Sequence, residues 1–276
     1  MKKLLVFTDL DGSLLDHHDY SWLEALPALN ALEQQLFPVI FNSSKTATEI
    51  VALKKQLKNY APFISENGAL ATIPRNYFSR ENFEYKLHID FDTHYLSPSY
   101  TRVTDILNRL REKHRFRFRG FNDMSVEEVS IETGLDKAQA LAAKQRQASE
   151  PMQWLDDEVR LGEFKSLLED AGLGVTSGGR FMHVMADATK GKAALWIKQQ
   201  YQQFEPETQW LTAGLGDSHN DIAMLEVVDY PVLISNPATR QPDVSHINNL
   251  ARPDLPGPAG WNKAVLDIIN DVRNGV

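Results

Sequence analysis

The sequence predicts an α/β protein that is built on a parallel sheet and carries an inserted α+β domain. Up to about residue 73, short apolar runs alternate with amphipathic helices, which is typical of βαβ units. Between residues 84 and 186 this pattern changes to a mixture of helices and alternating strands, and it resumes near Lys190. A chain of 276 residues is long enough for two domains. We therefore expect a core domain at 1–83 and 187–276 and an inserted domain at 84–186.

Apolar periodicity predicts the elements of the core. The run at 62–73 contains Asn67-Gly68, a turn signal that predicts a hairpin. The Pro- and Gly-rich segment 253–260 predicts a loop. Buried strands are expected from residue 4 and near 36–41, 62–73, 210–213 and 232–234, and helices near 21–35, 46–57, 191–203, 222–227 and 262–273.

The inserted segment is more varied in its patterns. Its one strict alternation, at 115–119, predicts a strand with an arginine face and an aromatic face. An arginine face suits an anionic ligand, but such a charge run is more often a solvated surface. Helices are expected at 100–113, 137–148 and 161–171, and shorter segments at 85–91, 126–133, 152–155, 173–176 and 180–185.

Composition excludes several classes of protein. The net charge of −8 argues against a nucleic-acid or anionic-membrane partner. Without cysteine there is neither a disulfide framework nor thiol chemistry. The apolar run that follows Met1-Lys2-Lys3 is too short for a signal peptide, and no apolar stretch approaches the roughly 20 residues of a membrane span. We expect a cytoplasmic protein.

Two acidic clusters each follow an apolar strand. Asp9 and Asp11 end the first strand, and two apart in an extended chain they project to one side, where they require a cation between them. The segment 214–221 repeats the combination of glycines and carboxylates after the strand at 210–213. Taken alone, the first cluster is equally consistent with a strand-to-turn exit in which Gly12 supplies a positive φ. Together they predict a shared site at the carboxyl ends of the strands.

A third strand end carries hydroxyl groups. Ser43 and Ser44 precede the helix expected from Thr46, whose N-terminus favours a phosphate because its N–H groups point outward. Plain N-capping is the alternative for both serines. Lys190, Lys192 and Lys45, taken singly, have the character of surface lysines.

Four motifs span most of the chain: Asp9-Leu10-Asp11-Gly12-Ser13, Ser43-Ser44-Lys45, Lys190-Gly191-Lys192 and Gly216-Asp217-Ser218-His219-Asn220-Asp221. In this order they resemble the motifs of the haloacid dehalogenase (HAD) superfamily phosphatases. Three further stretches resemble the mannosyl-3-phosphoglycerate phosphatase subgroup; they are Asn42–Thr46, Glu66-Asn67-Gly68-Ala69 and Pro256–Asn262. The resemblance implies a Rossmann-like core with an inserted cap of the C2B kind that closes over the active site.

Phosphoryl transfer requires a nucleophile, an acid and positive charge, and each of these roles has a candidate residue in the four motifs. Asp9 is the expected nucleophile, and Asp11 the acid that protonates the leaving oxygen and then the base that activates water. Mg²⁺ is expected on Asp9, Asp217 and the backbone carbonyl of Asp11, with Asp221 as a supporting or water-mediated ligand. The expected phosphate ligands are Ser43, Lys190 and the N–H groups around Gly12.

Substrate selection is expected in the cap. Arg180 follows two glycines and suits a carboxylate through bidentate hydrogen bonds. Asn67 is a further candidate for substrate binding. Weaker candidates for contacts with sugar hydroxyls are Glu66, Lys144, Arg146 and Ser149.

The resemblance implies a Mg²⁺-dependent phosphomonoesterase that acts on a small phosphorylated sugar acid, converting mannosyl-3-phosphoglycerate into mannosylglycerate and phosphate. Alternatives with the same chemistry are a glucosyl-3-phosphoglycerate phosphatase, a broader sugar-phosphate phosphatase and, less well supported, a phosphomutase. From another class, the chain could be a non-catalytic sugar-phosphate sensor, although a binding module does not need both Asp9 and Asp11. No residue pattern distinguishes mannose from glucose or indicates an oligomeric state.

Overall fold

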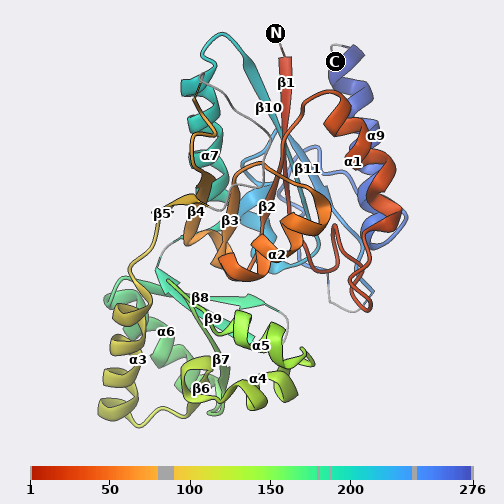
Figure 1. Ribbon diagram of the computed structural model, residues 1–276. Helices are drawn as coiled ribbons and strands as arrows, with labels where there is room; N and C mark the ends of the chain where they lie inside the picture. Colours follow the sequence, from red (N-terminus) through yellow and green to blue (C-terminus); the bar gives the residue numbers. More distant parts are fainter. Residues whose placement is uncertain (1, 80–89, 179–180, 187, 238–240, 275–276) are drawn as a thin grey trace.

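The computed structural model describes residues 2–79, 90–178, 181–186, 188–237 and 241–274. Its larger part contains a seven-stranded sheet and its smaller part a four-stranded sheet (Figure 1). The strands of the larger sheet are β1 (Lys2–Thr8), β2 (Val39–Asn42), β3 (Phe63–Ser65), β4 (Leu70–Pro74), β5 (Phe91–Tyr95), β10 (Gln209–Gly216) and β11 (Tyr230–Leu233). Their order is β11-β10-β1-β2-β3-β4-β5.

Five neighbouring strands, from β11 to β3, are parallel. Their carboxyl ends therefore meet at one edge, which faces the smaller part, while both chain termini lie at the opposite end (Figure 1). β3 and β4 pair antiparallel, which confirms the predicted hairpin.

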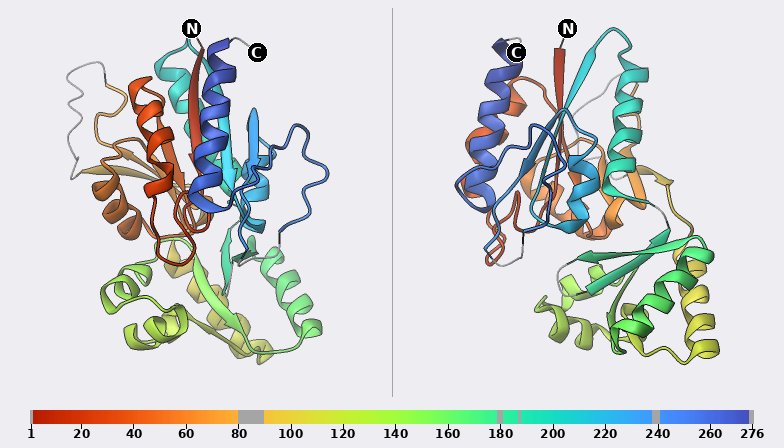
Figure 2. Two further views of the ribbon diagram at one scale, coloured as in Figure 1. Left: turned by 90° about the vertical axis from the view of Figure 1, so that its right-hand side faces the viewer. Right: turned by 180° about the vertical axis from the view of Figure 1, so that it is seen from behind.

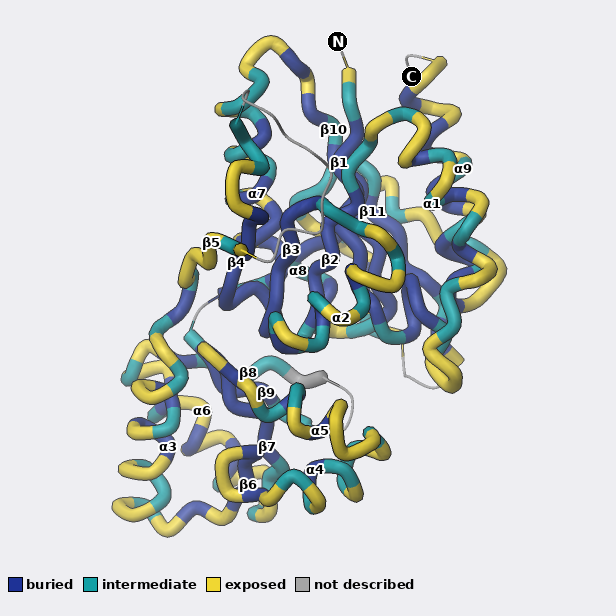
Figure 3. The backbone as a smooth tube through the Cα atoms, in the orientation of Figure 1, coloured by how far each residue is buried: buried dark blue, intermediate teal, exposed yellow. Residues whose placement is uncertain are grey.

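Helices cover both faces of the larger sheet (Figure 2). α1 (Leu26–Gln34), α2 (Ala47–Leu57) and α9 (Gly257–Asn274) pack on one face, and α7 (Lys190–Phe204) and α8 (Ile222–Leu225) on the other. The central strands are consequently dark along their length in Figure 3, because a parallel strand between two helical layers is buried on both sides.

Local chemistry explains where these helices begin. The Thr46 hydroxyl accepts a hydrogen bond from Glu49 N, and the Glu49 carboxylate accepts one from Thr46 N, forming a capping box that confirms the predicted start of α2. α9 begins at Gly257, inside the segment 253–260 that predicted a loop. The loop prediction therefore holds for 253–256 and is wrong for 257–260, because Pro258 is compatible with the first turn of a helix.

The smaller part is an antiparallel sheet with helices. Its strands are β6 (Phe118–Gly120), β7 (Glu150–Trp154), β8 (Leu173–Gly178) and β9 (Phe181–Ala186), in the order β6-β7-β9-β8. Its helices are α3 (Tyr100–His114), α4 (Val126–Thr133), α5 (Lys137–Ala143) and α6 (Glu158–Asp170). α3 and α6 bury one face of this sheet in an apolar cluster, and the other face is turned toward the larger part (Figure 2).

The structure differs from the expected insert at three places. Residue 84 lies outside the described residues, and β5, expected in the insert, pairs with β4 in the larger sheet. The strand expected at 115–119 is shorter, because Arg115 ends α3 with a left-handed φ of 58°. α5 ends at Ala143 rather than at residue 148. Among the described helices, none combines the length and apolar character needed to cross a membrane.

Candidate functional site

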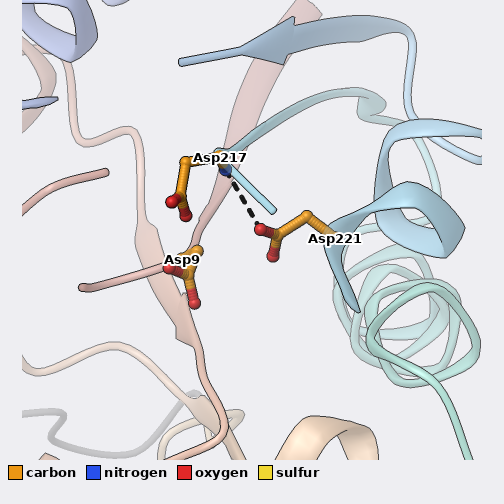
Figure 4. A group of neighbouring side chains, drawn as sticks. All are labelled: Asp9, Asp217 and Asp221. Atoms are coloured by element: carbon orange, nitrogen blue, oxygen red, sulfur yellow. Dashed lines mark hydrogen bonds between the residues drawn. The ribbon is translucent and has the colours of Figure 1, made fainter. Parts of the chain in front are cut away.

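Neighbouring strand ends bring the two acidic clusters together. β1 and β10 pair in register from Lys2 opposite Gln209 to Thr8 opposite Leu215, and Asp9 N donates to Leu215 O at 2.8 Å. Ligand oxygens of Asp9, Asp217 and Asp221 lie within 4.8 Å of one another, and all three side chains are buried (Figure 4). The predicted meeting of these three carboxylates is confirmed.

A loop and a helix start complete this cluster. Asp221 lies in a short 3-10 helix, His219–Asp221, and its Oδ2 accepts hydrogen bonds of 3.0 Å from Asp217 N and Ser218 N. The Nζ of Lys190, the first residue of α7, lies 2.5 Å from Asp9 Oδ1 and 2.6 Å from Asp221 Oδ1. Lys190 is therefore a buried cation between two carboxylates and not a surface lysine.

The cluster has an excess of negative charge. Burial raises the pKa of Asp9 well above its usual range; Lys190 lowers it in part, and the three neighbouring aspartates raise it further. Burial, followed by repulsion from Asp221, raises the pKa of Asp217 to about 6. Burial alone lowers the pKa of the Lys190 ammonium, but Asp221 and Asp9 outweigh it, and the pKa is raised.

This donor set fits a hard divalent cation. Three buried carboxylates face only one ammonium group. An added cation would therefore relieve the remaining repulsion between Asp9 and Asp217. Oxygen ligands of this kind are those that Mg²⁺ prefers.

Gly12 and Asn236 pack closely around Asp217. Gly12 has a φ of 82°, and a Cβ there would lie 2.9 Å from Asp217 Oδ2 and overlap the Asn236 amide. A side chain is therefore excluded by both conformation and space. Asn236 Nδ2 donates to Asp217 Oδ2 at 2.7 Å. Asn236 was not among the predicted site residues, although its place just beyond β11 is again a strand end.

Asp11 faces a different neighbour. Its Oδ2 lies 2.8 Å from Lys45 Nζ. Burial lowers the pKa of the Lys45 ammonium group, but attraction to Asp11 and Glu49 together outweighs burial, and the pKa is raised. Asp11 Oδ1 is buried and has no hydrogen-bond partner among the described residues. The expectation that Lys45 is a surface residue was wrong. Ser43 lies beside it, fully buried, and its Oγ accepts from Lys45 N at 3.2 Å.

A pocket of about 200 Å³ lies between the two parts of the structure. Residues that line it from the larger part include Asp11, Tyr20 and Lys45. From the smaller part they include Phe121, Arg146, Phe181 and His183. The pocket thus joins Asp11 to surfaces that come from the insert.

Glu66 connects the two parts directly. Its carboxylate accepts hydrogen bonds from three consecutive backbone N–H groups of the insert, at 147–149, and from Ser149 Oγ. Arg146 in turn donates to Ser44 O at 3.1 Å. Glu66 and Ser149 were expected to contact sugar hydroxyls, but in this structure they bind each other.

Two other residues expected to bind substrate, Asn67 and Lys144, form hydrogen bonds within the protein. Asn67 accepts from Asn220 Nδ2 at 2.9 Å and so supports the loop that carries Asp217. Lys144 donates to backbone carbonyls within the insert. Arg180 lies outside the described residues. On the arginine face, Arg117 pairs with Asp156, and Arg119 pairs with Glu128, which favours the solvated-surface alternative.

Comparison with known proteins gives one matching family, two relatives and one similar solved structure. A family model described as haloacid dehalogenase-like hydrolase matches residues 6–241. A glucosyl-3-phosphoglycerate/mannosyl-3-phosphoglycerate phosphatase of Methanococcoides burtonii is 39% identical, and one of Persephonella marina 34% identical, each over 99% of both chains. The solved structure of a sugar phosphatase of HAD subclass IIB superposes with a TM-score of 0.66 at 16% identity, covering 97% of this chain and 99% of the other.

Proposed function

Because the chain belongs to the haloacid dehalogenase-like hydrolases, we propose that it is a Mg²⁺-dependent phosphomonoesterase that hydrolyses mannosyl-3-phosphoglycerate and its glucosyl counterpart. The observation that carries this proposal is the contact of Lys190 with both Asp9 and Asp221, beside a pocket that Asp11 lines. This arrangement supports the assignment of Asp9 as nucleophile, Lys190 as the cation and Asp11 as the acid, with the pocket as the space for the leaving group.

In the first proposed step, an Asp9 carboxylate oxygen attacks the phosphorus atom. The bond between phosphorus and the glycerate oxygen breaks, and Asp11 gives its proton to that oxygen. The products are an aspartyl-phosphate and the free glycosylglycerate. Lys190 and Ser43 hold the phosphoryl oxygens, which carry the developing negative charge.

In the second step, water attacks the phosphorus of the aspartyl-phosphate. Asp11, now a carboxylate, accepts a proton from the water, and the bond between phosphorus and Asp9 breaks. Inorganic phosphate leaves, and the Asp9 carboxylate is regenerated. The position of Asp11 in the pocket, separate from the buried cluster, supports its assignment to proton transfer.

The acidic cluster would hold the metal through Asp9, Asp217 and the backbone carbonyl of Asp11. Asp221 would orient this set through its hydrogen bonds to Asp217 N and Ser218 N. Bound Mg²⁺ supplies positive charge that offsets the repulsion between the nucleophile and the phosphate.

The proposal is tested by measuring phosphate release with and without Mg²⁺. The substrates are mannosyl-3-phosphoglycerate, glucosyl-3-phosphoglycerate, 3-phosphoglycerate and common hexose phosphates, and the control protein is Asp9→Asn. We expect Mg²⁺-dependent turnover with a strong preference in kcat/KM for the glycosyl-phosphoglycerates. Asp9→Asn should bind these substrates without hydrolysing them.

Other results would point to the alternatives. Comparable slow turnover of all substrates would favour a broad sugar-phosphate phosphatase. Binding without turnover by the wild type would support a sensor.

A further inference from the structure

We propose that His183 is a specificity-determining residue whose imidazole hydrogen-bonds a hydroxyl group of the substrate's sugar. The identity of that sugar-bearing substrate rests on the proposed function. His183 belongs to the motif around Arg180, but it takes no part in the phosphoryl-transfer steps described above.

The alternation of β9 places His183 at the boundary between the two parts. Met182 and Val184 pack into the apolar cluster of the insert, on the side of α3 and α6. Residues on the opposite face point toward the larger part: Met185 packs against it, and Phe181 and His183 line the pocket that also contains Asp11. His183 is therefore part of the wall of the pocket assigned to the leaving group.

The ring has unused hydrogen-bonding capacity. The His183 residue is only 8% exposed, yet its Nδ1 is buried without a hydrogen-bond partner in the described part of the chain. Buried polar groups almost always have a partner, because leaving one unsatisfied costs about 1–3 kcal/mol. The imidazole therefore lies in the pocket wall with a nitrogen that no described residue engages, and a turn of the ring about χ2 would present that nitrogen to a ligand in the pocket.

The charge state of the ring selects the kind of ligand. Burial, with the nearby cations Arg146 and Lys190, lowers the pKa of His183 to about 3. A neutral imidazole has one N–H donor and one nitrogen acceptor. A hydroxyl group, which both donates and accepts, complements it in either tautomer.

The residues that line the pocket with His183 indicate that different side chains bind the anionic group and the sugar of the substrate. The cationic side chains that line the same pocket are Lys45, paired with Asp11, and Arg146, paired with Glu66. An anionic group of the substrate is attracted to such cations rather than to a neutral ring. Phe121 and Phe181, whose ring centroids are 5.1 Å apart, form an apolar wall. A sugar offers both hydroxyl groups and an apolar C–H surface, so it matches the wall formed by these rings and His183.

The test compares His183→Ala, His183→Gln and wild type on two kinds of substrate. Mannosyl- and glucosyl-3-phosphoglycerate carry a sugar, whereas 3-phosphoglycerate and p-nitrophenyl phosphate do not. In His183→Ala, KM for the glycosyl substrates should rise roughly 10-fold or more with little change in kcat, while kcat/KM for the sugar-free substrates stays within about twofold. His183→Gln, which keeps a donor and an acceptor, should recover part of the loss.

Met182→Leu is the matched control, because Met182 neighbours His183 on β9 but faces the apolar cluster. Met182→Leu should leave unchanged the ratio of kcat/KM for the glycosyl substrates to kcat/KM for the sugar-free substrates. Equal losses of kcat/KM on all four substrates in His183→Ala would overturn the proposal in favour of a structural role, and no loss on any of them would show that the ring does not contact the sugar.

Failure of the proposed function gives a different result. If the wild type does not prefer glycosyl-phosphoglycerates, the hexose phosphate with the highest kcat/KM takes their place as the sugar-bearing substrate. The ratio of its kcat/KM to that of p-nitrophenyl phosphate then tests His183 in the same way. A ratio unchanged by His183→Ala would then overturn the inference on its own.

Discussion

The carboxylate of Glu66 lies 3.5 Å from the Nε of Arg146, and both side chains are buried, 0% and 3% exposed. Glu66 comes from the loop after β3 and Arg146 from the segment after α5, so this ion pair joins the core to the insert. The same carboxylate binds the backbone N–H groups of 147–149. Glu66 therefore places one buried negative charge, with several hydrogen bonds, at the contact between the two parts.

Glu66→Gln should destabilise the protein markedly. The substitution removes the charge that balances Arg146 and places an amide NH₂ against backbone N–H donors. Breaking a buried pair on one side costs about 3–5 kcal/mol. Thermal and urea unfolding measure this loss. Glu163→Gln, at an exposed pair with Arg160, is the control and should cost less than about 1 kcal/mol; similar losses in the two variants would contradict the prediction.

Mg²⁺ should stabilise the folded protein through Asp217. A ligand that binds only the folded state adds about 2.7 kcal/mol at a concentration of 100 times its Kd. We expect Mg²⁺ to raise Tm in the wild type, and Asp217→Asn to need at least about tenfold more Mg²⁺ for the same shift. Asp267→Asn, at an exposed carboxylate of α9, should behave as wild type. Equal Mg²⁺ responses in all three proteins would exclude Asp217 as a ligand.

Lys190→Met should make stability depend more strongly on Mg²⁺. Without the ammonium group, Asp9 and Asp221 are buried without a cation, which costs about 3–5 kcal/mol in the presence of EDTA. Added Mg²⁺ should raise the Tm of Lys190→Met by more degrees than it raises the Tm of the wild type. Lys198 also lies on α7 and forms a surface ion pair with Asp229. Lys198→Met, which breaks that pair, should change Tm and its dependence on Mg²⁺ only slightly. Identical behaviour of the two variants would show that the Lys190 ion pairs contribute little.

Lys54 should make the protein more stable as pH rises from about 7 to 9.5. Burial lowers its pKa to about 7, whereas an unfolded lysine titrates near about 10.4. Between these values the unfolded chain binds more protons than the folded one, so the free energy of unfolding increases with pH. The gain is limited because Nζ donates to Ala61 O at 2.6 Å, which favours the charged form. Urea unfolding at both pH values should show a rise in wild type that is smaller in Lys54→Met; parallel pH profiles would argue against the lowered pKa.

Much of the fold and the core of the site could be predicted from the sequence, because they depend on local patterns. The alternation of apolar runs predicted the parallel strands, and Thr46, as a candidate N-cap residue, marked the start of α2. Asp9 and Asp217 could be paired in advance because strands in one parallel sheet place their carboxyl ends at the same edge. Their catalytic and metal-binding roles stay predictions.

The partners of Lys45 and Glu66, and the place of His183 in the pocket wall, were decided by the tertiary structure alone. Lys45 gave no local signal of its contact with Asp11, and Glu66 binds groups 81 to 83 residues away. His183 became a candidate only when the alternation of β9 was seen against the packed core. Charges and hydrogen bonds act over a few ångströms in space, so which groups pair depends on how the insert packs on the core, and no sequence period encodes that packing.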